Sequence, residues 1–297
     1  MVEVNKKHTL TGHKDSLYTL VVQNEKELYT AGGDGNVVHW DLDRPEQGKI
    51  VAKVDSSIYG MSLDYNELII GQNFEGIHVI DLETMKSKKS LKVGDKAIFD
   101  IKKINNNYWL ATGGGEVVVV NSDMQIVHRE CLSSENGRCI QYIPSRKEVA
   151  VGFSDNTIKI INAESFEHRW SFDAHGNSVF SMALSKDQKH LISTGRDARF
   201  KVWSTENYTL ETEVVAHMYA INSLDFSPNG QYFVTCSMDK SVKVWETATF
   251  RLLKVIDKAR HAGHGTSVNK VRWMSDEVVA SCSDDRTVSI WSIKITA

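Results

Sequence analysis

A segment that ends in Trp-Asp, or in a close variant of that pair, recurs along the whole chain of 297 residues. The seven segment ends are Trp40-Asp41, Ile80-Asp81, Val120-Asn121, Ile161-Asn162, Trp203-Ser204, Trp245-Glu246 and Trp291-Ser292. They are spaced by 40, 40, 41, 42, 42 and 46 residues. A period of roughly 40–45 residues is typical of four-stranded units that stack side by side. A single unit of this kind cannot bury its apolar faces alone, so the repeat predicts one array of seven units.

Inside each copy, β-branched and aromatic residues form short runs with a period of two. The sixth copy shows four such runs, at residues 221–226, 232–236, 242–245 and 252–256, and turn residues separate them. Runs with this pattern predict strands. Four short antiparallel strands in each of seven copies predict an all-β fold, a closed seven-bladed β-propeller.

Four copies carry the same polar residues in register with the Trp. A His stands near the start of the copy, an Asp stands six residues before the Trp, and a Ser or Thr stands ten residues before it. The four sets are His13, Thr30, Asp34 and Trp40; His175, Ser193, Asp197 and Trp203; His217, Thr235, Asp239 and Trp245; and His264, Ser281, Asp285 and Trp291. Over its full length the sequence resembles the WD-repeat β-propeller family, whose signature contains residues of these types at these spacings. The first and last copies also have the Gly-His pair of this family, and the fifth and sixth have Ala in place of the Gly.

The remaining copies depart from this signature, and we expect them to form degenerate blades. Copy four keeps only Asp155, and copies two and three have Phe74 and Gly114 where the Asp is expected. We predict a single domain over residues 1–297. The approximate blades are 14–54, 55–93, 94–132, 133–173, 174–215, 216–258, and 264–297 together with 2–10. The resemblance implies that the N-terminal strand completes the last blade, which would remove two exposed sheet edges.

The trio of Ser193, His175 and Asp197 has the residue types of a hydrolase, namely nucleophile, base and orienting carboxylate. The same trio recurs in four copies, and one chain does not need four active sites. A buried Trp needs a partner for its indole N–H, so we expect a hydrogen-bonded network instead. His261 and His264 form the only close His pair, and no Cys or carboxylate completes a zinc site. We therefore expect no catalytic residues, no metal and no cofactor.

Seven positions of the innermost strands are candidates for binding a partner. Successive side chains of a strand point to opposite faces. The apolar neighbours should therefore pack between the blades, and the candidates should point towards the channel mouth. They are Tyr18, Tyr59, Phe99, Arg138, Phe180, Asn222 and Asn269, and the turn residues Arg196 and Met238 border the same rim. Tyr and Arg are favoured in interface hot spots, so we expect a protein-binding or peptide-binding surface. The alternative is that the aromatic rings fill the channel and stack on one another. The longer basic loop at 257–261 is a second element of this rim.

Charge and composition limit the function classes. The chain has 35 Lys and Arg against 38 Asp and Glu, a net charge of −3, which disfavours nucleic acid as a partner. It has no apolar run long enough to span a membrane and no apolar leader near its start, so we expect a cytoplasmic, monomeric propeller with reduced cysteines. We predict a non-enzymatic scaffold for a protein or peptide partner. The alternatives are a propeller enzyme with a channel-mouth active site, or a structural subunit that assembles through its outer blade faces.

Overall fold

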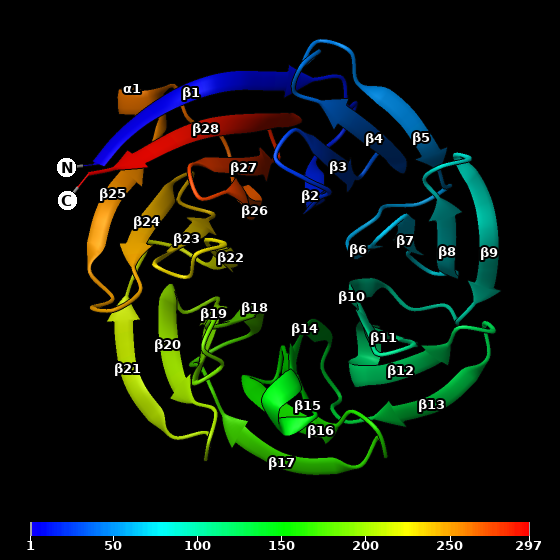
Figure 1. Ribbon diagram of the computed structural model, residues 1–297. Helices are drawn as coiled ribbons and strands as arrows, with labels where there is room; N and C mark the ends of the chain where they lie inside the picture. The colour runs from blue at the N-terminus through cyan, green and yellow to red at the C-terminus, as the bar shows by residue number, and fades with distance from the viewer. Residues whose placement is uncertain (1, 297) are drawn as a thin grey trace. The chain divides into compact units, whose positions relative to one another are not determined.

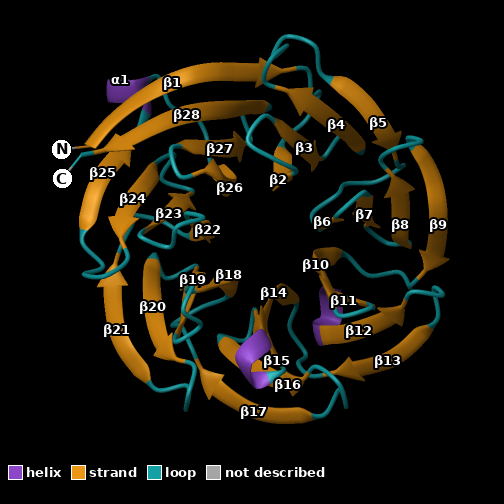
Figure 2. Cartoon of the chain, viewed as in Figure 1, coloured by secondary structure: helices purple, strands orange, loops and turns teal. Residues whose placement is uncertain are grey.

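The computed structural model describes residues 2–296 and has seven four-stranded antiparallel sheets. The predicted fold, an all-β propeller of seven blades, is confirmed. Between residues 2 and 296, the helices are α1 (Lys258–His261) and two short 3-10 turns at Gly113–Gly115 and Pro144–Arg146 (Figure 2). The chain divides into two compact units. Unit 1 combines the residues up to Lys53 with those from His217 onward, and unit 2 is Val54–Ala216.

Unit 1 contains blades 1, 6 and 7. Blade 1 is β2 (Leu17–Val22), β3 (Glu27–Gly32), β4 (Asn36–Asp41) and β5 (Lys49–Lys53). Blade 6 is β22 (Ile221–Phe226), β23 (Tyr232–Ser237), β24 (Val242–Glu246) and β25 (Leu252–Ile256). Blade 7 is β26 (Val268–Ser275), β27 (Val278–Ser283), β28 (Thr287–Ile295) and β1 (Val2–Thr11). The predicted closure is confirmed, because β1 pairs antiparallel with β28 from Val2↔Ile295 to Thr11↔Thr287 (Figure 1).

Unit 2 contains blades 2 to 5, and the copies without the polar signature also form complete blades. Blade 2 is β6 (Met61–Asp64), β7 (Glu67–Gln72), β8 (Gly76–Asp81) and β9 (Lys86–Lys92). Blade 3 is β10 (Ile98–Ile104), β11 (Asn107–Thr112), β12 (Glu116–Asn121) and β13 (Ile126–Cys131). Blade 4 is β14 (Gly137–Ile143), β15 (Glu148–Phe153), β16 (Thr157–Asn162) and β17 (His168–Asp173). Blade 5 is β18 (Val179–Leu184), β19 (His190–Gly195), β20 (Arg199–Ser204) and β21 (Leu210–Val215).

The middle strands of the blades are buried on both faces, whereas the outermost strands are largely exposed. In blade 3, for example, Val117–Val120 of β12 are fully buried, and four residues of β13 are exposed. Continuous apolar runs are typical of strands that are covered on both sides. Ile69, Ile77, Ile98 and Leu110 of blades 2 and 3 belong to one apolar cluster. Apolar packing between neighbouring blades therefore forms the core where the polar network is missing.

The innermost strands have a feature that simple alternation does not describe. Leu17 and Leu20 of β2 are both fully buried although they are three residues apart. The register with β3 shifts between Leu17 and Thr19, so Tyr18 is the extra residue of a β-bulge. The same shift falls at Phe99, Arg138, Phe180, Asn222 and Asn269. A bulge re-aims a side chain out of the sheet pattern. The expectation that alternation orients these side chains is therefore corrected, and bulges orient them instead.

Candidate functional site

One backbone hydrogen bond recurs in all seven blades and defines the position of the candidate binding residues. The N–H of a residue in the turn between the second and third strands donates to the carbonyl two residues before the candidate position, over 2.8–3.4 Å. The pairs are Gly33–Ser16, Asn73–Ser57, Gly113–Ala97, Ser154–Asn136, Arg196–Ser178, Met238–Ala220 and Asp284–Ser267. The seven candidates therefore occupy equivalent positions, including Arg138 of copy four.

In unit 2, four of these side chains stack on one another. The rings of Tyr59 and Phe99 are stacked with a centroid distance of 5.6 Å and an interplanar angle of 5°. The guanidinium carbon of Arg138 lies over the Phe99 ring at 4.2 Å and over the Phe180 ring at 4.9 Å. The side chains thus stack on one another, as the alternative to partner binding expected. All four nevertheless remain partly exposed. Cation–π and ring contacts of this kind fix the side chains in one arrangement.

Among the residues that the structure describes, Arg138 is a cation without a carboxylate partner. Within residues 2–296, no ion pair or hydrogen bond joins its guanidinium to an acidic side chain. Burial lowers the pKa of Arg138, and the positive charge of Arg196 lowers it further. Arg196 is exposed and lies in the turn between β19 and β20. Two guanidinium groups therefore raise the positive potential beside the stacked rings.

In unit 1, the equivalent positions are used for hydrogen bonds between blades. Asn222 Nδ2 donates to Ser267 Oγ at 3.1 Å and to the Val268 carbonyl at 2.9 Å. Asn269 Nδ2 donates to the Leu17 carbonyl and to Asp284 Oδ1, both at 2.7 Å. These two amides tie the innermost strands of blades 6, 7 and 1 together. Tyr18 is half-buried at the corresponding position of β2.

Met238 is 51% exposed in the turn between β23 and β24. Two further apolar residues, Met218 (82% exposed) and Tyr219 (62% exposed), lie in the adjoining loop. The Met238 N–H donates to the Ala220 carbonyl at 3.0 Å, and the Ser237 hydroxyl donates to the Tyr219 carbonyl at 3.0 Å. Sequence reasoning did not single out Met218 and Tyr219, although two large apolar residues directly after His217 are a visible signal.

The structure brings each of the four predicted polar sets together in one network. His Nδ1 lies 2.8–3.0 Å from the nearest Asp oxygen, His Nε2 lies 2.7–2.9 Å from the Ser or Thr oxygen, and Trp Nε1 lies 2.8–2.9 Å from that same oxygen. The Trp N–H donates to the hydroxyl, so the hydroxyl hydrogen is free to donate to His Nε2. The His then carries its proton on Nδ1 and donates to the carboxylate. The Trp-to-hydroxyl pairs are Trp40 with Thr30, Trp203 with Ser193, Trp245 with Thr235, and Trp291 with Ser281.

The four hydroxyl residues of the networks differ from the rim candidates in their burial. Each lies in the second strand of its blade and is 0% exposed, whereas the seven inner-strand candidates are partly exposed. Their residue types would suit a nucleophile, but their positions disagree with that role, because a fully buried hydroxyl that is bonded to both His and Trp is closed to a substrate. They are equally closed to a partner protein, so they are structural positions and not part of a binding surface. These residues are Thr30 of β3, Ser193 of β19, Thr235 of β23 and Ser281 of β27.

The electrostatics of the blade 6 network favour a neutral His217 and an ionised Asp239. Burial alone would raise the pKa of Asp239, but hydrogen bonds from His217, Ser241 and the Met218 backbone hold that pKa well below its usual range. The same balance lowers the pKa of Asp285. Burial lowers the pKa of His217 despite its acidic partner. Because the network is buried, the loss of any one member would leave a polar group unpaired.

The turns of blades 2, 3 and 4 replace the network in different ways. Asn73 Oδ1 accepts a hydrogen bond from the Ile98 N–H at 2.8 Å, and Phe74 beside it is 64% exposed with a φ of 65°. Asp155 accepts a hydrogen bond from the Ser133 hydroxyl at 2.6 Å. Gly115 is left-handed (φ 74°), and a Cβ there would lie 1.9 Å from the Ser133 carbonyl oxygen. The Gly-rich segment of blade 3 is therefore a tight turn.

The basic loop at 257–261 forms α1 and lies against β1. Asp257 caps the helix, because its side chain accepts from the Arg260 N–H at 2.8 Å. The Arg260 guanidinium also bonds Asp257, at 2.6 and 2.9 Å. Lys6 Nζ donates to the Ala262 carbonyl at 2.8 Å. One positive charge of this loop, that of Arg260, is thus paired within unit 1. In residues 2–296, no three His, Cys, Asp or Glu side chains are grouped so that they could hold a metal ion.

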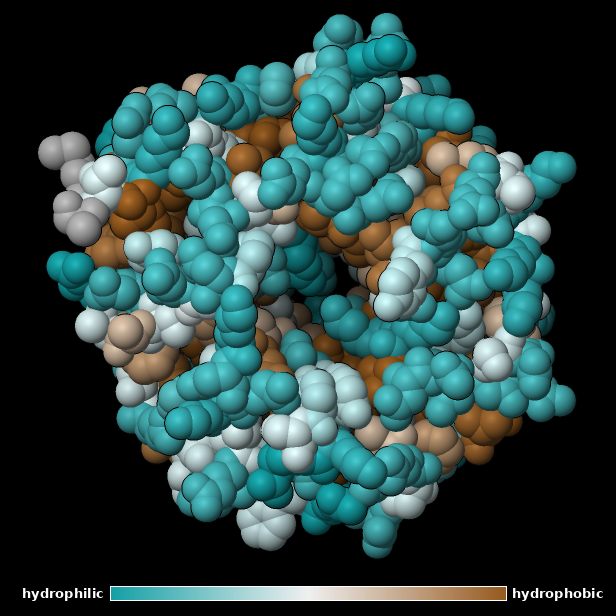
Figure 3. Space-filling model, in the orientation of Figure 1, coloured by the Kyte–Doolittle hydropathy of each residue, from teal (hydrophilic) through white to brown (hydrophobic). Residues whose placement is uncertain are grey.

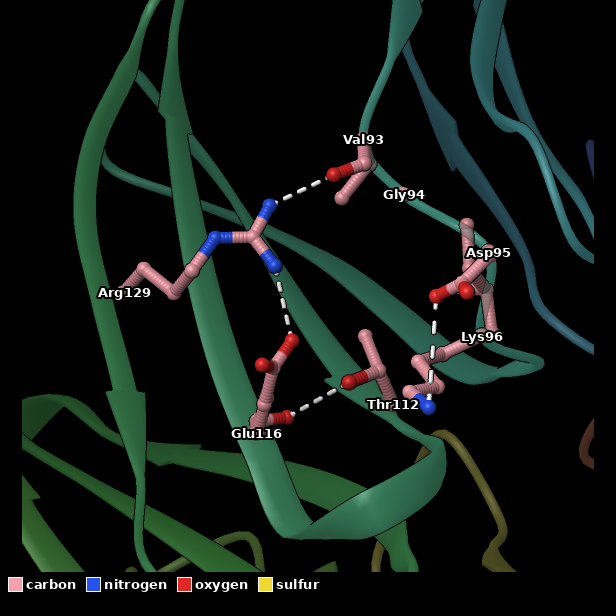
Figure 4. Close-up of a pocket in the computed structure, with 8 residues that line it drawn as sticks. Val93, Gly94, Asp95, Lys96, Thr112, Glu116 and Arg129 are labelled. Carbon is pink, nitrogen blue, oxygen red and sulfur yellow. Dashed lines mark hydrogen bonds and ion pairs between the residues drawn. The ribbon is translucent and has the colours of Figure 1, made fainter.

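A small pocket lies between blades 2 and 3, and Figure 4 shows its lining. Its volume is about 70 Å³, whereas ligand pockets are roughly 300–1,000 Å³. Arg129 crosses the pocket and donates to Glu116 Oε2 at 2.7 Å and to the Val93 carbonyl at 2.5 Å. The Thr112 hydroxyl donates to the Glu116 carbonyl at 3.0 Å. The pocket is too small for a metabolite, and several of its polar groups are bonded to one another.

Hydrophilic residues cover most of the face seen in Figure 3, with hydrophobic side chains showing between them. Between residues 2 and 296, no helix has the length and hydrophobicity needed to cross a membrane.

Comparison with known proteins agrees with the repeat pattern. The family model described as "WD domain, G-beta repeat" matches residues 4–41, 166–204, 208–246 and 257–292, together about half of the chain. A "Ribosome biogenesis protein WDR12 homolog" of Trichoplax adhaerens is 22% identical over 199 residues, 67% of this chain and 38% of the relative. "WD repeat-containing protein 3" of Homo sapiens is 27% identical over 75 residues, 25% of this chain and 8% of the relative.

A third relative, "DDB1- and CUL4-associated factor 13" of Dictyostelium discoideum, is 34% identical over 58 residues, 20% of this chain and 13% of the relative. The chain thus spans less than two fifths of the length of each of these relatives. The model matches cover blades 1, 5, 6 and 7, the four blades that carry the polar network. With these matches and its seven four-stranded blades, the chain belongs to the WD-repeat family.

Proposed function

We propose that the chain is a non-enzymatic scaffold that binds a peptide segment of a partner protein on unit 2. The proposed site consists of Tyr59, Phe99, Arg138, Phe180 and Arg196, which we call the stack surface. The observation that carries the proposal is the stack itself. Four consecutive blades place an aromatic ring or a guanidinium at the same position, in mutual contact and partly exposed.

The physical argument is that these side chains are ordered before a partner arrives. Aromatic and Arg side chains are the common anchors of protein interfaces, because they bury a large area and lose little conformational freedom when they bind. Here each side chain is already fixed by its neighbour in the stack, so less side-chain entropy remains to be lost on binding.

The other sites support a binding role over an enzymatic one. The Ser, His and Asp side chains that resemble a hydrolase site are used in the buried networks. Asn222 and Asn269 are secondary in this proposal because their amide N–H groups are already hydrogen-bonded. Tyr18 and Met238 of unit 1 are also assigned a secondary role. The name of the third relative says that it associates with two other proteins, which supports an interaction role here. We further propose an intracellular, monomeric propeller without nucleic-acid partners.

A selection from a library of random peptides displayed on phage tests this proposal. The wild-type chain should enrich peptides, and Phe99→Ala and Phe180→Ala should each lose that enrichment. The most enriched peptide, made synthetically, should bind each variant about 2 kcal/mol more weakly, a roughly thirtyfold higher Kd. Tyr65→Ala is the matched control, because Tyr65 is an aromatic residue outside the stack and 91% exposed. Peptide enrichment that is unaffected by both Phe substitutions, or no enrichment at all, would overturn the proposal.

A further inference from the structure

We infer that the stack surface binds a side-chain carboxylate of its partner peptide, and that Arg138 is the residue that binds it. This inference rests on the proposed function and adds the chemistry of the partner to it.

The first step is the contrast between Arg138 and other arginines of unit 2. Arg129, Arg146 and Arg169 each donate to a Glu carboxylate, over 2.7–3.0 Å. Arg138 has only the rings of Phe99 and Phe180 as partners, among the described residues. Rings attract the positive charge, but they leave the guanidinium N–H donors without oxygen acceptors from an acidic group.

The second step is the energetic consequence of this arrangement. Arg138 is partly buried, and the positive charge of its neighbour Arg196 repels it. A partly buried cation that lacks a counter-ion is unfavourable, and an incoming anion would offset that cost. The free unit therefore holds a preorganised anion site, because the position of the guanidinium is already fixed by two rings.

The third step selects the anion. The guanidinium fork matches the two coplanar oxygens of a carboxylate. A nucleic acid would require an extended basic surface. This chain has a net charge of −3, and the stack surface offers two guanidinium groups. One Asp or Glu side chain on a peptide that also contacts Phe99 and Phe180 fits these groups.

The peptides enriched from the random library provide the test. We expect them to share an Asp or Glu at one position. The wild-type chain should bind the synthetic peptide with Glu there at least tenfold more tightly than the Gln peptide, as measured by fluorescence anisotropy. Arg138→Met should abolish this preference, since Met can occupy the space between two rings without a charge. Arg251→Ala, which removes a 69% exposed Arg side chain on blade 6, should leave the preference unchanged.

The possible failures are distinguishable. If peptides are enriched and depend on Phe99 and Phe180 but show no Glu preference, the carboxylate inference is wrong and the proposed function stands. If the preference persists in Arg138→Met, another cation is responsible and the assignment to Arg138 is wrong. A phosphoserine peptide that binds more tightly than the Glu peptide would assign the site to phosphate instead. The comparison of Glu and Gln peptides on the wild-type chain does not depend on the folding of any variant.

Discussion

Units 1 and 2 are built from the same kind of blade, yet they use equivalent positions differently. In unit 1 all three blades have the buried polar network, and two bulge positions carry amides that hydrogen-bond neighbouring blades. In unit 2 only blade 5 has the network, and the equivalent inner positions carry three rings and an Arg.

This difference shows that a repeat fold can change the side chain at an equivalent position without losing the blade. The backbone of a blade is specified by strand pairing and by apolar packing on its neighbours, so a polar position can change without loss of the blade. Blades 2 and 3 are complete although their polar signature is gone. Unit 1 uses two of its variable positions for internal hydrogen bonds, whereas our proposal assigns those of unit 2 to a partner.

Removal of β1 is expected to have the largest effect, and to affect unit 1 more than unit 2. Unit 1 joins two distant segments of the chain through the pairing of β1 with β28, and Leu10 of β1 is 1% exposed. A variant that lacks residues 2–11 should expose the edge of β28 and aggregate. In hydrogen exchange, blades 6 and 7 should lose protection and blades 3 and 4 should keep more of it. A monomeric variant with wild-type thermal stability would contradict the role of this strand.

A smaller loss is expected from a single network residue of unit 1. Asp239→Ala should lower the free energy of unfolding by about 1–3 kcal/mol, because the Nδ1–H of buried His217 loses its acceptor. The Asp239 side chain is only 8% exposed, so water replaces it poorly. Asp123→Ala, in an exposed turn, is the control and should change little. Equal denaturation midpoints for the two variants would show that the network does not stabilise blade 6.

Acid should weaken blades 1 and 6 more than blade 3, and the direction follows from the pKa shifts. The pKa of His217 is lowered from 6.5 by burial, and that of His13 is lowered in the same way. The unfolded chain therefore takes up protons first as the pH falls below 6.5, and stability decreases. The lowered pKa values of Asp34, Asp239 and Asp285 add a further loss below pH 3.8, the ordinary value.

Hydrogen exchange at pH 7 and pH 5, corrected for the intrinsic rate, measures this effect blade by blade. Blades 1 and 6 should lose more protection than blade 3. Blade 2 is not a reference here, because burial also lowers the pKa of its His78. An equal loss in blade 3 would show that the network His and Asp residues do not cause the effect.

The smallest expected effect concerns local opening within unit 2 at neutral pH. Residues 55–130 lack the network, so amides in blades 2 and 3 should exchange faster than those in blade 5, which has it. Both sets belong to one compact unit, which makes blade 5 an internal control. Equal protection would mean that apolar packing alone is sufficient.

The repeat, the number of blades and the closing strand could be predicted from the sequence, because the spacing of the Trp-Asp pairs and the strand runs are local signals. The equivalence of the seven inner positions also follows from the repeat. The bulges could not be predicted by alternation, although the separation of three between Leu17 and Leu20 contains the signal.

The contacts of the candidate site depend on neighbouring blades and are not visible in any single copy. The stacking of Arg138 between Phe99 and Phe180 joins residues about 40 positions apart, one repeat period. The hydrogen bonds from Asn222 and Asn269 to the next blade likewise cannot be predicted from a single copy. The sequence predicts these positions, but it does not show which of the side chains are hydrogen-bonded to a neighbouring blade.

The most direct test of the division between the units compares Phe180→Ala with Asn222→Ala, which are equivalent positions of unit 2 and unit 1. Both variants would be measured for affinity to the same selected peptide and for their denaturation midpoints. We expect Phe180→Ala to raise the Kd roughly thirtyfold, and Asn222→Ala to leave the Kd unchanged while lowering the midpoint. If Asn222→Ala weakens binding as much as Phe180→Ala does, recognition is not confined to the stack surface and the division between the units is wrong.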